Sequence, residues 1–355
     1  MPSFKLGKHS IGFTDPLYFI ADIAANHDGD LNRAYKLIEL AKEAGAHAAK
    51  FQNFVASKIV SRKGFDSLGG QLTHQASWKK SVYETYEDAS VSYDWTEKLK
   101  EKCKEVDIEY FTSPYDFESV DHVDPYVLAY KIGSGDITWH EIIKYIAKKR
   151  KPVFIATGAS TLKEVKLAMN ILQKNAVNIV LMQCNTNYTA NVSNYKFINL
   201  NVLKTYAELF PDVVLGLSDH THGHSTVLGA IAMGARVFEK HFTDNNNREG
   251  PDHKFAMNPH TWKEMVDRGN ELYLALGDGN KMIEENEKQS SVVQRRCLRF
   301  TDNFNEGHIL QEGNLYPLRP ENSDGILPYE IGDLLGKKLK RNVMADDYIR
   351  WEDIK

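Results

Sequence analysis

Residues 215–242 have the sequence LGLSDHTHGHSTVLGAIAMGARVFEKHF, and this stretch decides the fold of the chain. It opens with an apolar run that ends abruptly at Ser218 and His220. Apolar residues then recur at helical spacing, and a second apolar run ends at His241. The pattern predicts a strand, a helix and a second strand, with a histidine at the carboxyl end of each strand.

The two histidines are candidate metal ligands. A lone histidine at the end of a strand is more often a satisfied core residue than a ligand. In a parallel barrel, however, adjacent strands end at the same face, where chemistry takes place. Two imidazoles at that face can share one ion. The sequence therefore predicts that His220 and His241 hold a divalent metal.

The pattern of short apolar strand, polar loop and amphipathic helix recurs along the chain from Tyr18. Strands that alternate with helices indicate a parallel sheet, and eight such units over this length predict a (β/α)8 TIM barrel of α/β class. The predicted strands are 18–23, 47–51, 109–112, 128–132, 153–156, 178–183, 213–217 and 236–240.

Three further segments fall outside that repeat. Residues 4–14 are compatible with a short hairpin. Residues 57–90 interrupt the second unit as a long loop, and a loop at the catalytic face usually helps to form the substrate pocket. We expect a barrel domain over 1–280, a polar linker over 281–291, and a small β-rich domain with short strands and turns over 292–355.

Composition excludes several classes of protein. The chain has 355 residues and a formal net charge of -4, with acidic and basic residues interspersed, so it lacks the concentrated basic face typical of nucleic-acid binding. Neither a signal peptide nor a run of membrane-spanning length is evident, and we expect a cytoplasmic protein. The three cysteines, which are far apart, are expected to be small buried hydrophobes rather than disulfide or zinc ligands.

The residues at the predicted strand ends form a chemically coherent set. Two lysines and several hydroxyls at one face would suit a phosphate or a carboxylate, and two neutral imidazoles would suit a divalent ion. Taken singly, each has a structural explanation: a lysine can snorkel to the surface, and the tyrosine can be a core aromatic. The prediction depends on their convergence. The set is Asp22, Lys50, Gln52, Ser113, Lys131, Ser134, Asp136, Thr186, Tyr188, Ser218, His220 and His241.

The chain resembles a known family over essentially its whole length. The strings IADIAANHDGDL, AKFQ, YKIGSGD, ATGAS, GLSDHT, EKHFT and REGPDH occur in the order and spacing of the sialic acid synthases. That family contains bacterial N-acetylneuraminate, legionaminate and pseudaminate synthases and the animal 9-phosphate synthases. GHILQEGNLYPLRP and IGDLLGKKLKRNV resemble their C-terminal antifreeze-like (SAF) domain.

The resemblance implies a TIM barrel with an SAF domain, usually in a domain-swapped homodimer. It implies condensation of phosphoenolpyruvate with an N-acetylmannosamine-like amino sugar, giving a nine-carbon 2-keto-3-deoxy acid and phosphate. His220 and His241 would hold Mn2+, with Mg2+ or Co2+ as substitutes. Phosphoenolpyruvate would contact Lys50, Ser113, Lys131, Ser134, Thr186 and Ser218. The amino sugar would contact Gln52, Asp136, Tyr188 and Asp252, together with Arg319 reaching over from the partner chain.

Proton transfer would fall to Asp22, Asp252 or metal-bound water, and the sequence does not choose among them. Asp22 stands where most members of the family have a glutamate. Ala156 replaces a serine found in some members. The string QCNTNYT replaces the usual HCTxxYP and leaves two candidates, Thr186 and Asn187, for one anion-binding position. These departures, and the loop at 68–90, leave the identity of the hexosamine open, with a 2,4-diacetamido sugar as one candidate.

Three other functions are compatible with parts of the pattern. A Schiff-base aldolase would use Lys131 as a nucleophile, but it would have little use for two histidines. A metal-dependent hydrolase would use the histidines and Asp22, but it would leave the paired lysines unexplained. A carbohydrate-binding protein would fit the C-terminal domain, but it would not need the polar strand ends.

Overall fold

The computed structural model describes residues 2–189 and 191–355. The chain forms two compact units, of which the first ends at Gly277 and the second spans Asp278–Lys355. This division lies within a few residues of the boundary expected at 280.

Eight parallel strands form the centre of the first unit. Their order is β5-β4-β3-β10-β9-β8-β7-β6, and the outermost strands β5 and β6 are neighbours, so the sheet curves into a barrel. This confirms the predicted TIM barrel, with strand bounds that differ from the predicted ones by one or two residues. The strands are β3 (Tyr18–Asp22), β4 (Ala48–Asn53), β5 (Glu109–Pro114), β6 (Tyr130–Ile132), β7 (Val153–Ala156), β8 (Ile179–Cys184), β9 (Val214–Asp219) and β10 (Val237–His241).

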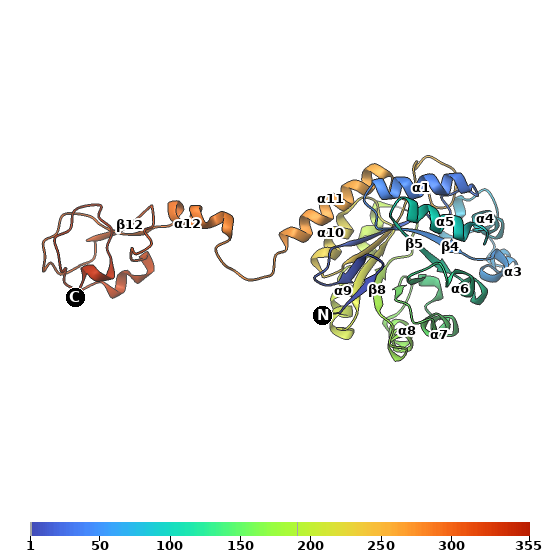
Figure 1. Ribbon diagram of the computed structural model, residues 1–355, viewed down its shortest axis with the longest axis horizontal. Helices are drawn as coiled ribbons and strands as arrows, with labels where there is room; N and C mark the ends of the chain where they lie inside the picture. Colours follow the sequence, from blue (N-terminus) through green and yellow to red (C-terminus); the bar gives the residue numbers. More distant parts are fainter. Residues whose placement is uncertain (1, 190) are drawn as a thin grey trace. The chain divides into compact units, whose positions relative to one another are not determined.

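Amphipathic helices surround the strands (Figure 1). Helix α1 is typical: the Asp30 side chain caps its first turn, and Ala34, Leu37, Ile38 and Ala41 face the sheet. The helices of this unit are α1 (Leu31–Glu43), α2 (Ala56–Ile59), α3 (Arg62–Asp66), α4 (Val82–Ala89), α5 (Trp95–Glu105), α6 (Phe117–Val123), α7 (His140–Lys148), α8 (Leu162–Lys174), α9 (Val202–Leu209), α10 (Ser225–Ala232) and α11 (Pro259–Ala275).

Apolar side chains fill the barrel interior at the end opposite to the carboxyl ends of the strands. The expected hairpin is present as β1 (Ser3–Leu6) and β2 (His9–Gly12), which pair antiparallel. Its side chains Phe4, Leu6 and Ile11 join the barrel residues Tyr18, Ile20, Ala48, Phe111, Ala129, Phe154, Val180, Met182, Val214 and Val237 in one buried cluster. We call this cluster the apolar floor.

Strand alternation places polar residues directly above the apolar floor. Successive side chains of a strand point to opposite faces, so a floor residue and the residue two positions later both face the barrel interior. Lys50 lies two residues after Ala48, Lys131 two residues after Ala129, and Glu239 two residues after Val237. A polar layer therefore covers the floor on the side of the strands' carboxyl ends.

The segment 57–90 was predicted as a long loop, and most of it is helical. Helices α2, α3 and α4 and the 3-10 segment η1 (Thr73–Ser77) lie in or at the edge of it. At α4, Ser81 accepts from the backbone N–H of Glu84, and the Glu84 carboxylate accepts from the Ser81 N–H in return. This capping box satisfies two backbone donors and explains why a short polar segment forms a helix.

The second unit has its own hydrophobic core, formed by Leu298, Phe300, Leu310, Leu315, Ile326, Leu334, Leu339, Val343, Ile349 and Ile354. Strands β11 (Cys297–Phe300) and β12 (Leu315–Leu318) pair antiparallel within it. The segment predicted as a linker contains η4 (Glu285–Glu287) and the start of helix α12 (Lys288–Gln294).

Cys103, Cys184 and Cys297 are all buried free thiols, as expected from their spacing. Across residues 2–189 and 191–355, no helix has both the length and the apolar character needed to cross a membrane.

Candidate active site

A cluster of buried charges forms the polar layer. The Lys50 Nζ lies 2.5 Å from Oδ2 of Asp22 and 3.7 Å from Oε1 of Glu239. The same Glu239 oxygen lies 3.1 Å from Lys131 Nζ and accepts a hydrogen bond of 3.2 Å from Ser218 Oγ. These side chains come from strands β3, β4, β6, β9 and β10, so the barrel itself brings them together. Glu239 therefore connects the two lysines.

The electrostatics favour the charged forms of Glu239 and Lys50. Burial opposes the charge on Glu239, but Lys131 and Lys50 outweigh burial and hold the pKa of its carboxyl at about 2. Burial also opposes the charge on Lys50, yet Asp22 and Glu239 together raise its pKa above the ordinary value. The Lys50 ammonium and the Glu239 carboxylate are therefore charged, whereas burial raises the pKa of Asp22 in spite of the nearby Lys50.

The two predicted metal ligands lie side by side at the top of this cluster. The ring centroids of His220 and His241 are 5.4 Å apart. Burial, aided by His241, lowers the pKa of His220 to about 3, and burial lowers the pKa of His241 to about 4. Both imidazoles are neutral at pH 7, which is the form that binds metal ions.

The hydrogen bonding leaves imidazole nitrogens available. His220 Nδ1 lies 2.8 Å from the Asn185 carbonyl oxygen. Because a carbonyl only accepts, Nδ1 carries the hydrogen and Nε2 keeps its lone pair. His241 Nδ1 is buried and has no hydrogen-bond partner among residues 2–189 and 191–355, and Oδ2 of Asp252 is 3.9 Å from it. Two free imidazole nitrogens with a carboxylate nearby fit a divalent cation.

A complete cage of protein ligands is not formed. In the described part of the chain, there is no group of three or more His, Cys, Asp or Glu side chains arranged to hold a metal ion. A cation at the histidine pair would accordingly keep coordination positions for water or substrate, as catalytic ions do.

Hydroxyl groups surround the lysines. The Ser113 Oγ is buried without a hydrogen-bond partner among the described residues. The Ser134 Oγ accepts a bond of 2.9 Å from the Gly158 N–H. A Cβ placed on Gly158 would lie 2.5 Å from the Thr186 side chain and 3.0 Å from Ser134 Oγ, so glycine allows these two hydroxyl-bearing residues to approach the same point. Ser113 lies two residues after Phe111 on β5 and so shares its face, toward the barrel interior that also contains the lysines. An orphaned buried hydroxyl there is a candidate contact for a ligand.

The two candidates in the QCNTNYT string have different surroundings. Asn187 uses its side-chain oxygen within its own loop, where it accepts from Thr189 and from Asn194. The Thr186 methyl group lies against Gly158, close to Ser134. Contact of either residue with an anion stays a prediction.

Aromatic side chains enclose the histidine pair. The Tyr188 ring centroid is 4.2 Å from that of His220, and the Phe255 centroid is 4.8 Å from that of His241. Tyr188 and Phe255 are 5.5 Å apart. His74, from the long segment 57–90 of the barrel, packs on Tyr188 with ring centroids 4.8 Å apart. That segment therefore reaches the site, as expected.

Three other predicted sugar contacts lie at the strand ends. Asp252 accepts from the backbone N–H of Ala25 at 3.3 Å, which ties its loop to the one after β3. Burial raises the pKa of Asp136 to about 6, so this group changes charge near neutral pH. Gln52 lies on β4, two residues after Lys50, and is half-buried.

Arg319 belongs to the second unit, where it follows β12 and is exposed. Its role in the site stays a prediction.

Glu239 is the site residue that the sequence analysis missed. The signal was available, because Glu239 precedes His241 by two residues on a strand and therefore shares its face, just as Ser218 precedes His220.

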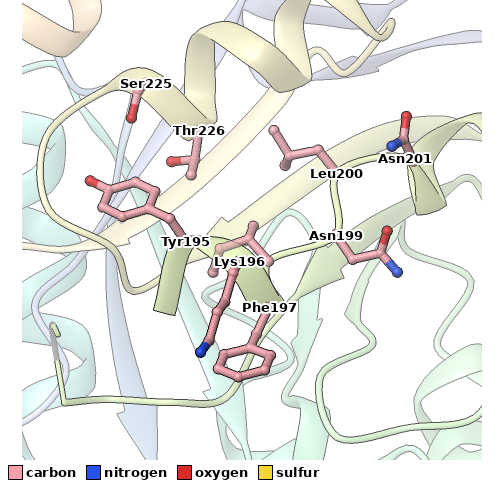
Figure 2. A pocket seen from close by; sticks show the side chains of 9 residues that line it. Tyr195, Lys196, Phe197, Asn199, Leu200, Asn201, Ser225 and Thr226 are labelled. Carbon is pink, nitrogen blue, oxygen red and sulfur yellow. The ribbon is translucent and has the colours of Figure 1, made fainter. Parts of the chain in front are cut away.

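A cavity of about 710 Å3 lies apart from the charged cluster. Figure 2 shows Tyr195, Lys196 and Phe197 on the loop after β8, with Ser225 and Thr226 at the start of α10. None of the predicted site residues lines it. The chemistry suggested by the lysines and histidines is located at the barrel end and not in this cavity.

Comparison with known proteins agrees with this geometry. The model of the NeuB family matches residues 37–281, and that of the SAF domain matches residues 295–355. The N,N'-diacetyllegionaminic acid synthase of Campylobacter jejuni serotype O:2 is 35% identical over 93% of this chain and 98% of its own length. The pseudaminic acid synthase of C. jejuni serotype O:23/36 is 32% identical over 96% and 97%.

A solved structure gives the same result. The N-acetylneuraminic acid (sialic acid) synthetase of Leptospira borgpetersenii is 25% identical, with a TM-score of 0.72 over 81% of this chain and 94% of that one. Fold, site and relatives together define a barrel of the nonulosonic acid synthase class with a C-terminal SAF domain. The chain belongs to the NeuB family.

Proposed function

We propose that the protein condenses phosphoenolpyruvate with an N-acetylmannosamine-like amino sugar to give a nine-carbon 2-keto-3-deoxy acid and inorganic phosphate. The observation that carries this proposal is the convergence of Lys50 and Lys131 on Glu239, directly beneath the neutral pair His220 and His241. Relatives named as legionaminic and pseudaminic acid synthases support it.

The lysine layer is the proposed site for phosphoenolpyruvate. That substrate carries a carboxylate and a phosphate, and the two ammonium groups that meet at Oε1 of Glu239 offer one cation to each. Ser113, with its orphaned hydroxyl, and Ser134, Thr186 and Ser218 would supply hydrogen bonds. Ala156 adds none, so this chain has one hydroxyl fewer than some members of the family.

The histidine pair is the proposed metal site, with Mn2+ as the expected ion and Mg2+ or Co2+ as substitutes. A divalent cation there would polarise the aldehyde oxygen of the open-chain sugar and make its carbon electrophilic. The protein's own contribution is to keep both imidazoles neutral and to fix the tautomer of His220 through Asn185. Tyr188 and Phe255 exclude bulk water from the pair.

In the proposed reaction, C3 of phosphoenolpyruvate forms a bond to the aldehyde carbon, and the aldehyde oxygen takes up a proton. The positive character left at C2 is captured by water, which releases a proton. The bond between C2 and the phosphate oxygen then breaks as the C2 hydroxyl becomes the keto group, and its proton passes to the phosphate that leaves. Asp22 and Asp252 are the nearest carboxylates to His241, at 3.7 and 3.9 Å, and are the candidates for moving these protons.

The Schiff-base alternative is less well supported. A lysine nucleophile must be a free amine, whereas the Lys131 ammonium is engaged with Glu239 at 3.1 Å. A metal-dependent hydrolase would give neither buried lysine a role in the reaction. Neither alternative uses the whole cluster.

Phosphate release from phosphoenolpyruvate tests the proposal. The assay contains Mn2+ and a panel of acceptors: N-acetylmannosamine, its 6-phosphate, and 2,4-diacetamido-trideoxy hexoses. Release with one acceptor, loss of release with a chelator, and a nine-carbon acid by mass spectrometry are the expected results. Release that resists chelators, together with trapping by borohydride, would instead establish the Schiff-base aldolase.

Two finer statements belong to the same proposal. The protein is expected to form a domain-swapped homodimer, and Arg319 of the partner subunit is expected to contact the N-acyl group of the sugar. Light scattering in solution tests the first. The kinetic effect of replacing Arg319, described in the Discussion, tests the second.

A further inference from the structure

A second buried ion pair lies on the other face of the strands that carry the histidines. Asp219 and Lys240 are register partners on β9 and β10. The Lys240 Nζ lies 2.5 Å from Asp219 Oδ2, and each side chain is only 1% exposed. Because side chains alternate along a strand, this pair points into the layer between sheet and helices, while His220 and His241 point into the barrel.

The Asp219 carboxylate organises the chain that follows His220. Its Oδ2 accepts from Thr226 Oγ1 at 2.7 Å and from Thr221 Oγ1 at 2.8 Å, and its Oδ1 accepts from the Thr221 N–H at 3.1 Å. Burial opposes the charge, but Lys240 and the two hydroxyls outweigh burial and lower the pKa of Asp219. The carboxylate is therefore charged and fully bonded.

Lys240 links this network to the second strand. Its ammonium also donates to the Thr221 carbonyl oxygen at 2.6 Å. Thus one cation binds the residue before His220 through its side chain and the residue after His220 through its backbone. Lys240 itself immediately precedes His241. The same group consequently fixes the backbone beside both imidazoles.

A hydrogen bond from another part of the chain also reaches the loop at 221–226. The Tyr195 hydroxyl donates to the His222 carbonyl oxygen at 2.5 Å, and Figure 2 shows Tyr195 beside Ser225 and Thr226. The loop from 221 to 226 is thus bonded from the strand layer and from the loop after β8. It carries no substrate contact in the proposed function, so this bonding is explained by what the loop positions.

Stability alone is a weak explanation for the pair. Burying two charges costs desolvation, and a packed apolar pair of similar volume is often equally stable or more so. What an apolar pair could not do is bond Thr221 at its hydroxyl, its N–H and its carbonyl oxygen. The pair therefore fixes the position of Thr221 through hydrogen bonds, which hydrophobic packing would not do.

We infer that Lys240 and Asp219 are positioning residues that set the separation of His220 and His241 for a shared divalent cation. This inference rests on the proposed metal site. Both side chains lie on the face of the strands opposite to the one on which substrate and metal are proposed to bind. Partners that orient ligands from outside the coordination sphere commonly change metal affinity by about 10- to 100-fold when they are removed.

The test measures binding of Mn2+ alone by electron paramagnetic resonance, which counts free ion and reports the symmetry of bound ion. In Lys240→Met, we expect the dissociation constant to rise by about 10- to 100-fold. Because this variant leaves Asp219 as an uncompensated buried charge, the double variant Asp219→Asn with Lys240→Met is made in parallel. Its thermal stability should exceed that of the single variant, but its Mn2+ affinity should stay low, since Thr221 still lacks its lysine.

Leu172→Ala is the control. Leu172 is buried on α8 and has no bond to the network, so this variant should lower the melting temperature without altering Mn2+ affinity. Mn2+ affinity within threefold of the parent in either folded Lys240 variant would overturn the inference. Failure of the parent protein itself to bind Mn2+ would instead refute the proposed metal site.

Discussion

Glu239→Gln is the most informative single substitution, because it removes one charge and almost no volume. Glu239 lies 3.1 Å from Lys131 and 3.7 Å from Lys50, and no other carboxylate contacts both lysines in the described residues. A pKa of about 2 in place of 4.5 corresponds to about 3 kcal/mol favouring the charged form in the folded protein.

The loss of that interaction should appear in the unliganded protein. For a barrel of this size, about 3 kcal/mol lowers the melting temperature by about 6–12 °C. Phosphoenolpyruvate should reverse the effect, because its two anionic groups replace the missing carboxylate. We therefore expect the temperature shift caused by phosphoenolpyruvate to be larger in the variant than in the parent, and its dissociation constant to be lower.

Differential scanning fluorimetry with and without phosphoenolpyruvate, and calorimetric titration without acceptor sugar, measure both quantities. Glu208→Gln is the matched control, because it makes the same chemical change on the exposed face of α9. It should alter neither quantity. A smaller shift in Glu239→Gln than in the parent would mean that Glu239 does not occupy the place of an anion, and the reasoning would fail.

Three further outcomes are expected. His220→Ala or His241→Ala should abolish Mn2+ binding and turnover, since a two-imidazole site cannot lose one; a calorimetric titration with Mn2+ that still shows parental binding would refute the assignment. Arg319→Ala should raise the KM for the sugar more than the KM for phosphoenolpyruvate, and equal increases would indicate a folding or dimer defect. His47 should make the fold acid-sensitive. Burial, aided by nearby cations, lowers its pKa to about 4, and its Nδ1 accepts from the Phe19 N–H. The unfolded chain takes up this proton below about pH 6.5 and the folded chain does not, so stability falls by up to about 3 kcal/mol between pH 6.5 and pH 4. His47→Asn keeps an acceptor, and the difference between parent and variant in urea unfolding at pH 7 and pH 5 should show the loss; equal pH dependence would contradict it.

The strands could be predicted because each is a short apolar run followed by polar residues, and barrel geometry then places their ends together. That is why Asp22, Lys50, His220 and His241, which were predicted at four strand ends, lie close together. The helices at 57–90 were missed although Ser81 and Glu84 carry a capping-box signature, because the segment as a whole lacks apolar periodicity.

Side-chain interactions between strands could not be predicted from the sequence. That Glu239 connects two lysines, and that Lys240 bonds Thr221, depends on which residues face the same side at the same height. Register supplies that information, and local patterns do not. Arg319 is a different case, since its contribution depends on an arrangement of subunits that no strand pattern encodes.

The apolar floor affects the electrostatic field that the buried charges produce outside the barrel. Phe111, Phe154 and the hairpin side chains seal the interior from below, so dissolved ions can approach the lysines only from the open end. Hydrocarbon polarises weakly, and the field of the buried cluster, in which carboxylates partly balance the two ammonium groups, is directed outward through that opening. Salt can then screen the field on one side only. Capture of an anion by this barrel should accordingly depend less steeply on ionic strength than capture by lysines on an open surface.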